Sequence, residues 1–315
     1  MLRKRLSGGV AMSVEWHGVS YHGKLNVSGI NLLDRGGRKV VLRGMSSHGM
    51  QWYPQFARTE SIRTTKQAGA NVFRVAMYTD EGGYLTNRAV AKDVIRAVDD
   101  TLALDMYAII DWHIMFDNDP LVHVEEAQSF FDYISRYYKD APGVLYEICN
   151  EPNGAEVTWA KNVKPYAQKV IPVIRKNAPN SVILAGCPTW SQDVDICAAD
   201  PLEFDNIMYT LHFYAGTHGA ELRSKCLKAL EMGAPIFVSE WGTSAADGNG
   251  GVFLNESDVW LRFLAQYDIS WCNWNLGDRD ETSAALSPGA PLGNWTQEQL
   301  SKSGRYVFSK LNGTI

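Results

Sequence analysis

Short apolar runs rich in β-branched and aromatic residues alternate along the chain with longer segments whose apolar positions recur at helical spacing. Most of the short runs are continuously apolar, which is typical of strands buried on both faces. Their starts lie 25 to 38 residues apart, which leaves room for one helix and two connections in each interval. The pattern predicts eight strands, at 40–44, 71–77, 106–112, 144–149, 181–186, 206–211, 235–239 and 269–274.

Residues that terminate helices bound the intervening segments. A helix that begins near Thr59 is expected to end at Gly69, and another to end before Pro179. Eight strands separated by helical segments, without a Pro- or Ser-rich linker, predict a single (β/α)8 TIM barrel of the α/β class. A doubly wound sheet is much less favoured than the barrel, because residues 44–49 lack the GxGxxG spacing expected after the first strand of such a sheet. The helix that ends before Pro179 is expected over 157–177, and the others over 89–105, 123–139, 220–232, 256–266 and 297–311.

The start of the chain is expected to stand apart from the barrel. We expect a poorly ordered extension over 1–15 and the barrel domain over 16–315. Residues 19–27 and 29–39 resemble short hairpins, the second turning at Asp34-Arg-Gly-Gly, and should cover the bottom of the barrel. The opening MLRKRLSGGVAMS holds no apolar stretch of seven residues, so this sequence shows no signal peptide. No run of 18 apolar residues exists, so no membrane span is expected.

Composition narrows the classes of function. The chain has 315 residues, 45% of them hydrophobic and 21% charged, which excludes disorder and disulfide miniproteins. Its net charge is −5 and its one basic run is Arg3-Lys4-Arg5, so a nucleic-acid partner is not expected. The five cysteines form no CxxC pair and no cluster with zinc spacing. The chain has ten tryptophans, more than ordinary usage predicts. Both sugar-binding clefts and apolar cores use tryptophan.

Polar and aromatic residues follow the predicted strands, and chemistry in a TIM barrel lies at the carboxyl ends of its strands. A carboxylate that ends an apolar strand is costly unless it is paired. This happens twice, at Glu151 after the fourth strand and Glu240 after the seventh. A single such glutamate is often a structural loop cap, whereas two glutamates beside His, Arg and Tyr favour catalysis. The neighbouring strand-end residues are His48, Arg74, Tyr78, His113, Asn150, Trp190, His212, Tyr214 and Trp274.

Seven segments in order carry a resemblance to a known family. They are 43–49 (RGMSSHG), 71–78 (NVFRVAMY), 111–113 (DWH), 146–152 (YEICNEP), 211–214 (LHFY), 239–242 (SEWG) and 273–276 (NWNL). Together they resemble glycoside hydrolase family 5, and most closely its bacterial-type endo-1,4-β-glucanases, over about residues 20 to 310. The resemblance implies an endo-acting, retaining cellulase that cleaves internal β-1,4-glucosidic bonds of cellulose and related β-glucans. It also implies a secreted protein, which we expect to be a monomer without cofactor or metal.

The resemblance assigns Glu151 as acid/base and Glu240 as nucleophile. Retaining hydrolysis requires two carboxyl groups about 5 Å apart. Strands four and seven lie on nearly opposite sides of an eight-stranded barrel, so these glutamates can face each other across its mouth. Arg74 and Tyr214, if close, should keep Glu240 ionised, whereas Glu151 needs a raised pKa to remain protonated.

The remaining candidates are expected to bind sugar or support the pair. By resemblance, Asn150 contacts the sugar 2-OH, while His113 and His212 bind hydroxyls or tune the carboxylates. The alternatives without a catalytic role are a turn residue for Asn150, a structural or metal-binding role for His113 and His212, and an ion pair at the barrel rim for Arg74. No HExxH or three-histidine spacing supports a metal. By resemblance, His48, Trp52, Tyr78, Trp190 and Trp274 line sugar subsites, although a tryptophan is usually a core residue.

Two positions depart from the family pattern, and other functions stay open. Arg279 stands where many relatives have lysine, so its sugar contact is less secure, and Met115-Phe116 is bulkier than expected. Mannanase, xyloglucanase or mixed-linkage glucanase specificity remains possible, since loops set specificity. An inactive or purely sugar-binding barrel would not need both carboxylates. A phosphate-binding isomerase would need a basic residue beside the glycine-rich 247–251 loop, which has none.

Overall fold

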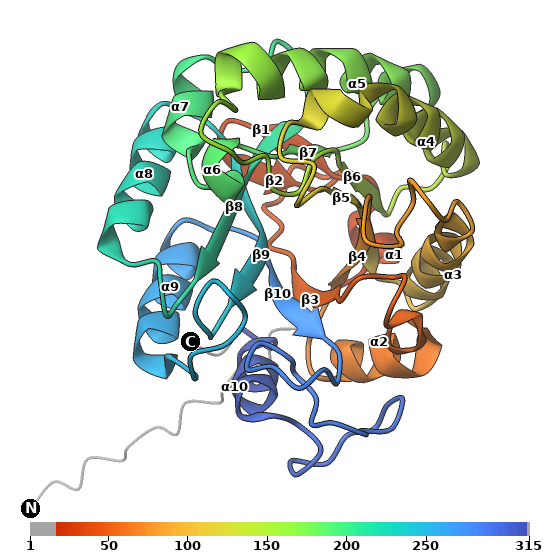
Figure 1. Ribbon diagram of the computed structural model, residues 1–315, viewed down its shortest axis with the longest axis vertical. Helices are drawn as coiled ribbons and strands as arrows, with labels where there is room; N and C mark the ends of the chain where they lie inside the picture. Colours follow the sequence, from red (N-terminus) through yellow and green to blue (C-terminus); the bar gives the residue numbers. More distant parts are fainter. Residues whose placement is uncertain (1–16, 314–315) are drawn as a thin grey trace, which may run out of the picture.

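Eight parallel strands close into a barrel in the order β10-β3-β4-β5-β6-β7-β8-β9. This computed structural model describes residues 17–313, so the expected extension over 1–15 lies outside the described residues. Helices surround the strands in Figure 1, which confirms the predicted single (β/α)8 barrel. The barrel strands are β3 (Arg43–Ser47), β4 (Val72–Tyr78), β5 (Tyr107–His113), β6 (Val144–Glu147), β7 (Ile183–Ala185), β8 (Ile207–Tyr214), β9 (Ile236–Gly242) and β10 (Trp271–Leu276).

The expected helices are present, with one apolar face turned to the barrel. In α3 (Val90–Ala103), Val90, Val94, Ala97 and Thr101 are buried at the three- and four-residue spacing of one helix face. No helix among residues 17–313 is long and apolar enough to cross a membrane. The other long helices are α2 (Thr59–Gln67), α4 (Val124–Tyr137), α5 (Lys164–Asn177), α8 (Ala220–Glu231), α9 (Leu254–Gln266) and α10 (Lys302–Lys310).

Five short helical segments were not predicted as separate elements. Two are the 3-10 turns η1 (Pro54–Phe56) and η2 (Pro120–His123), and a third is the π-helical turn η3 (Trp159–Val163) before α5. After β7, where no helix was predicted, the chain forms α6 (Pro188–Ser191) and α7 (Val194–Ala199). Segments of three to six residues are too short to show a helical period in the sequence.

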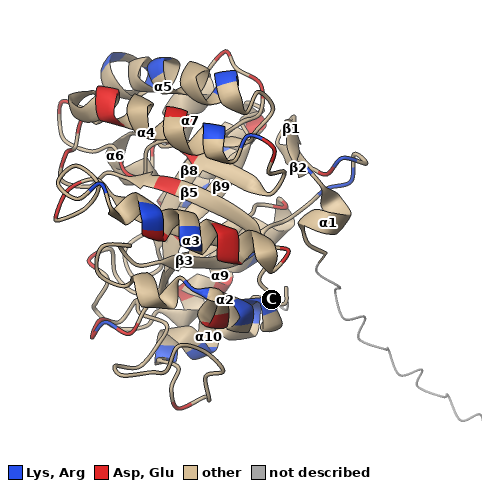
Figure 2. Cartoon of the chain, turned by 90° about the vertical axis from the view of Figure 1, so that its right-hand side faces the viewer, with Lys and Arg blue, Asp and Glu red and all other residues tan. Residues whose placement is uncertain are grey.

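The N-terminal segment covers the bottom of the barrel, as predicted, but its first part is different. The hairpin predicted over 19–27 is wrong: α1 (Val19–His22) is a helical turn, and β1 (Asn26–Ser28) pairs with β2 (Asn31–Leu33) instead. The Asp34 turn is present, since the amide of Gly37 donates to the Asp34 carbonyl at 3.0 Å. Leu25 and Leu32 pack against the amino ends of the strands. Figure 2 shows α1, β1 and β2 together at this end.

Strand register brings the polar residues to the opposite end. β5 and β6 pair Asp111 with Glu147, and β8 and β9 pair His212 with Glu240. Several strands run two or three residues past their predicted ends, because polar residues that point into the barrel mouth interrupt the apolar runs. The chemistry-bearing side chains therefore come largely from rigid strand ends, which hold geometry better than loops.

Candidate active site

The carboxyl ends of the strands open into a cavity of about 400 Å³. Two buried glutamates from different strands meet there: Glu151 follows β6, and Glu240 lies on β9. One carboxylate oxygen of each, together with a ring nitrogen of His212, lie within 4.8 Å of one another. This short separation agrees with the spacing of about 5 Å that retaining glycoside hydrolysis requires. The lining residues are Met115, Glu151, Trp190, Gln192, His212, Tyr214, His218, Glu240 and Ala246.

Glu240 is held in its ionised form. The guanidinium of Arg74 donates to its Oε2 at 2.9 Å, and the hydroxyl of Tyr214 donates to its Oε1 at 2.7 Å. Burial alone would raise the pKa of this carboxyl, but the positive charges of His212 and Arg74 outweigh burial and lower it. An ionised carboxylate with both oxygens oriented is suited to nucleophilic attack.

Glu151 has the opposite electrostatics. Burial raises the pKa of its carboxyl, and the negative charge of Glu240 raises it further. A hydrogen bond of 2.8 Å between Oε1 and Nδ1 of His212 offsets only part of that shift. Two carboxyl groups whose environments push their pKa values apart are the arrangement that a general acid and a nucleophile need.

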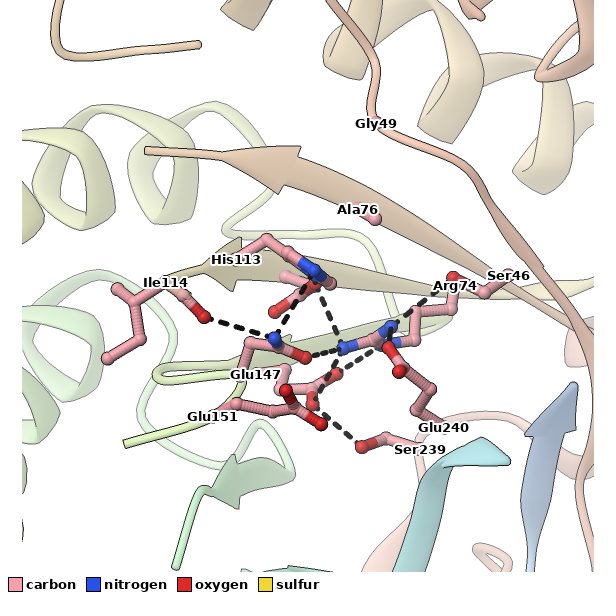
Figure 3. Close-up of polar contacts among 12 residues, drawn as sticks. Ser46, Gly49, Arg74, Ala76, His113, Ile114, Glu147, Glu151, Ser239 and Glu240 are labelled. Atoms are coloured by element: carbon pink, nitrogen blue, oxygen red, sulfur yellow. Dashed lines mark hydrogen bonds and ion pairs between the residues drawn. The ribbon is translucent and has the colours of Figure 1, made fainter. Parts of the chain in front are cut away.

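Arg74 lies at the centre of a buried polar network (Figure 3). Besides Glu240, its guanidinium donates to Glu147 at 2.7 and 3.1 Å, and to Oδ1 of Asn150 at 2.6 Å. It also lies 3.0 Å from a carboxylate oxygen of Asp111. Burial would raise the pKa of Glu147, but the charge of Arg74 outweighs burial and lowers it to about 2. The alternative of a rim ion pair is wrong, because Arg74 is fully buried and contacts Glu240 directly.

The sequence analysis did not single out Glu147 and Asp111. Both interrupt continuous apolar strands, and a charge inside such a run needs a buried partner. That signal was present in the sequence, but only the fold shows that one arginine serves both carboxylates.

His113 and Asn150 orient each other beside the pair. Nδ1 of His113 contacts Asp111 at 2.6 Å, and its Nε2 faces the Asn150 amide nitrogen at 3.2 Å. Burial and the charge of Arg74 lower the pKa of His113 to about 3, so its ring is neutral. A neutral ring that accepts from Asn150 at Nε2 carries its proton at Nδ1 and donates to Asp111. Asn150 thus contacts Arg74 and His113 together, which a simple turn residue would not do.

Aromatic side chains form one wall of the site. The rings of Tyr78 and His113 stack with centroids 4.1 Å apart, and those of His113 and Trp274 stack at 5.2 Å. His48 lies 5.2 Å from Trp274, and Trp52 lies 5.0 Å from Tyr78. The structure therefore brings these five predicted residues together. Stacked aromatic faces with polar neighbours suit the flat, hydroxylated face of a sugar ring.

Trp190 lies apart from this wall and lines the cavity with 46% of its surface exposed. Its amide donates to the Pro152 carbonyl at 3.1 Å, which ties its loop to the segment that carries Glu151. Thr189, Trp190 and Ser191 have φ values of 57°, 53° and 55°, a left-handed run that is rare for bulky residues. The neighbouring structure holds this backbone in place and aims the indole into the cavity.

Arg279 lies beside His48, and no interaction joins it to the catalytic pair. Its Nη1 is 3.5 Å from Nε2 of His48, and its Nε is 3.4 Å from a carboxylate oxygen of Glu281. Asn275 and Ser283 donate to Glu281 and fix its position. Burial and the charge of Arg279 lower the pKa of His48 to about 3. Sequence reasoning did not identify Glu281 as a partner of Arg279.

Among the residues that the structure describes, one group of His, Cys, Asp or Glu side chains has ligand spacing for a metal: Glu151, His212 and Glu240. The two aspartates of the loop at 117–119 accept hydrogen bonds from other side chains of the protein: Thr79 donates to Asp117, and Asn162 donates to Asp119. All five cysteines are free and buried.

A barrel with an acidic and an ionised carboxyl at this spacing has the arrangement of a retaining glycoside hydrolase. Residues 33–280 match the family model described as Cellulase (glycosyl hydrolase family 5). The chain belongs to glycosyl hydrolase family 5, which confirms the resemblance in the sequence.

Named relatives agree with this family. The chain is 53% identical over 277 residues to Endoglucanase A of Evansella cellulosilytica, covering 87% of this chain and 57% of that protein. It is 49% identical over 298 residues to an endoglucanase of Clostridium saccharobutylicum, covering 94% and 66%. The chain thus spans less than two thirds of these curated relatives.

Solved structures are similar over nearly the whole chain. Cellulase Cel5C_n has a TM-score of 0.90 at 46% identity, covering 94% of each chain. The catalytic domain of Thermobifida fusca endoglucanase Cel5A, a Glu-to-Gln variant in complex with cellotetraose, has a TM-score of 0.89 at 37% identity, covering 93% and 98%.

Proposed function

We propose that this protein is an endo-acting, retaining β-1,4-glucanase that cleaves internal bonds of cellulose and related β-glucans. The observation that carries the proposal is the pair of buried carboxyl groups, Glu151 and Glu240, with oxygens within 4.8 Å and oppositely shifted pKa values. The endoglucanase names of its relatives and the cellotetraose bound by one structural neighbour support the substrate class.

Double displacement follows from this geometry. Glu240 attacks the anomeric carbon while Glu151 delivers its proton to the departing oxygen, which leaves with the electrons of the broken bond. Glu151, now a carboxylate, takes a proton from water as that water attacks the glycosyl–enzyme bond and releases Glu240. Arg74 and Tyr214 orient the nucleophile, and Asn150 lies where it can contact the sugar 2-OH.

Sugar binding is assigned to the aromatic wall and the opposite tryptophan. Trp274, at the end of β10, would stack beneath the sugar at the cleavage point, with Tyr78, Trp52 and His48 on the same side. Trp190 would bind the leaving-group side, because it lines the cavity beside Glu151. Arg279 would reach the substrate only near His48.

A comparison of substrates tests this function. Carboxymethylcellulose, barley glucan, xylan and mannan should be assayed side by side, and the first two should be cleaved fastest with a rapid fall in viscosity. The first product from a cellooligosaccharide should be the β-anomer by NMR. Faster cleavage of mannan or xylan would place the chain among other family 5 specificities, and an initial α-anomer would exclude double displacement.

The remaining expectations belong to the same proposal. We propose that the protein acts outside the cell as a monomer on its polysaccharide. Gel filtration with light scattering tests the oligomeric state, and fractionation of the native host tests the location.

A further inference from the structure

Ser239 lies directly before the proposed nucleophile on β9 and is fully buried. Its hydroxyl oxygen is 2.7 Å from Oε1 of Glu147 and 3.0 Å from Nε2 of His212. The other ring nitrogen of His212 contacts Oε1 of Glu151 at 2.8 Å. Ser239 therefore joins the Arg74–Glu147 ion pair to the proposed acid/base through the imidazole ring of His212. Figure 3 shows the hydrogen bond between Ser239 and Glu147.

The direction of each hydrogen bond follows from counting protons. Glu147 is ionised beside Arg74, so its oxygens can only accept. A serine hydroxyl has a single hydrogen, so Ser239 donates it to Glu147. The lone pair of Ser239 then accepts from Nε2 of His212, which must carry a proton. Nε2 of His212 is thereby fixed as a protonated donor.

The other nitrogen of His212 determines where Glu151 keeps its proton. Burial would lower the pKa of His212, but its hydrogen bonds toward Glu147 and Glu151 raise it to about 9. The ring is then an imidazolium, and Nδ1 donates to Oε1 of Glu151. Oε1 is occupied as an acceptor, whereas no donor among residues 17–313 contacts Oε2. The transferable proton belongs on Oε2.

We propose that Ser239 is a positioning residue for acid/base catalysis, holding His212 so that the proton of Glu151 stays on the oxygen that faces the glycosidic bond. This inference rests on the proposed function. In the step that it serves, the Oε2–H bond of Glu151 breaks and the proton goes to the glycosidic oxygen. That oxygen takes the electron pair of its bond to the anomeric carbon, to which Glu240 bonds. Ser239 itself neither gains nor loses a proton.

Several charged or titratable groups face the His212 ring, and its titration depends on all of them. They are Arg74 from β4, Asp111 and His113 from β5, Glu147 and Glu151 from β6 and its end, Glu240 from β9 and His218 after β8.

Ser239→Ala removes the link without changing a charge. General acid catalysis contributes about 10²-fold or more, and its misalignment should lower kcat/KM for cellotetraose by about 10-fold or more. For dinitrophenyl β-cellobioside, whose leaving group needs no proton, kcat/KM should stay within about twofold. Nitrogen NMR of labelled imidazole should show a lower His212 pKa. Ser239→Thr keeps the hydroxyl and should restore both the pKa and the cellotetraose rate.

Ser270→Ala provides the matched control. Ser270 is a buried serine beside β10 whose hydroxyl accepts from the Leu42 amide, far from the glutamates along the barrel axis. This variant should leave both substrates and the His212 pKa unchanged. Equal losses on both substrates in Ser239→Ala, or an unchanged His212 pKa with unchanged rates, would overturn the inference. If the wild-type protein cleaves no β-glucan, the proposed function fails instead, and that result is seen before any variant is made.

Discussion

Arg74 and Glu240, 166 positions apart in the sequence, form a buried ion pair of 2.9 Å between β4 and β9. The same guanidinium contacts Glu147 and Asp111, so one cation orients carboxyl groups from three strands. The proposed nucleophile is therefore positioned by the barrel wall itself rather than by a loop.

Arg74→Lys should keep the charge and lose the forked geometry, since an ammonium cannot reach all of these oxygens. We expect kcat/KM on carboxymethylcellulose to fall by about 10²-fold, as when one oriented donor is removed from an active site. Arg96→Lys, at an exposed ion pair on α3, is the control and should be silent. Wild-type activity in Arg74→Lys would show that the charge alone suffices.

The roles of the two glutamates can be separated with azide. Glu151→Ala should lose activity on cellulose but still be glycosylated by an activated aryl glycoside, because that leaving group departs without a proton. The covalent intermediate should accumulate, and azide should release it as the β-glycosyl azide.

Glu240→Ala should form no intermediate with any substrate. Azide can occupy the vacated nucleophile position and attack from the opposite face, which gives the α-glycosyl azide. NMR of the product anomer reads out both variants. If the two anomers are exchanged, the assignment of acid and nucleophile is reversed.

The pH dependence of kcat/KM should follow the two opposite pKa shifts. Activity requires ionised Glu240, so with its lowered pKa activity is lost only as the pH falls through a value below that of an ordinary glutamate. Activity also requires protonated Glu151, so with its raised pKa activity is lost as the pH rises through a value above the ordinary one. With the wild-type protein, the alkaline limb should appear in a pH series on cellotetraose and be absent from a series on dinitrophenyl β-cellobioside, whose leaving group needs no proton. A persistent alkaline limb would assign that titration to another group.

Prolonged treatment with a chelator should leave activity essentially intact, because the proposed chemistry uses two carboxyl groups and positioned donors. Activity on carboxymethylcellulose before and after treatment measures this. A loss that Ca²⁺ restores would reveal a structural ion, and the loops at 117–119 and 278–281 would be examined first.

The barrel could be predicted because strands buried on both faces leave continuous apolar runs, which are hard to mistake when eight recur with helices between them. Strand ends were less predictable. The strand predicted to stop at 211 continues to Tyr214, since His212 and Tyr214 point into a polar mouth rather than an apolar core. The N-terminal hairpin error has a different cause: a four-residue helix carries no periodic signal.

Site residues were predicted where a family motif or a position near a strand end marked them, and were missed where only a partner on another strand gives them a role. Glu151 and Glu240 follow or end apolar runs and resemble family motifs. The roles of Asp111, Glu147 and Ser239 depend on their contacts with Arg74 or His212 on other strands. The spacing of residues along one strand does not predict such contacts. Only the register between strands in the folded barrel shows which of these side chains meet.

The left-handed run at Thr189, Trp190 and Ser191 couples local stability to the position of the cavity-lining indole of Trp190. Each such residue costs roughly 1–2 kcal/mol relative to ordinary helical backbone, so the native state carries a local destabilisation at the loop that aims the exposed indole. Thr189→Gly, at an exposed position, would relieve that backbone strain. It would also leave the Trp190 indole less firmly oriented. Efforts to raise the thermostability of this protein should therefore begin elsewhere in the barrel. A gain in stability at this loop is expected to weaken the binding that we propose for Trp190 on the leaving-group side of the glucan.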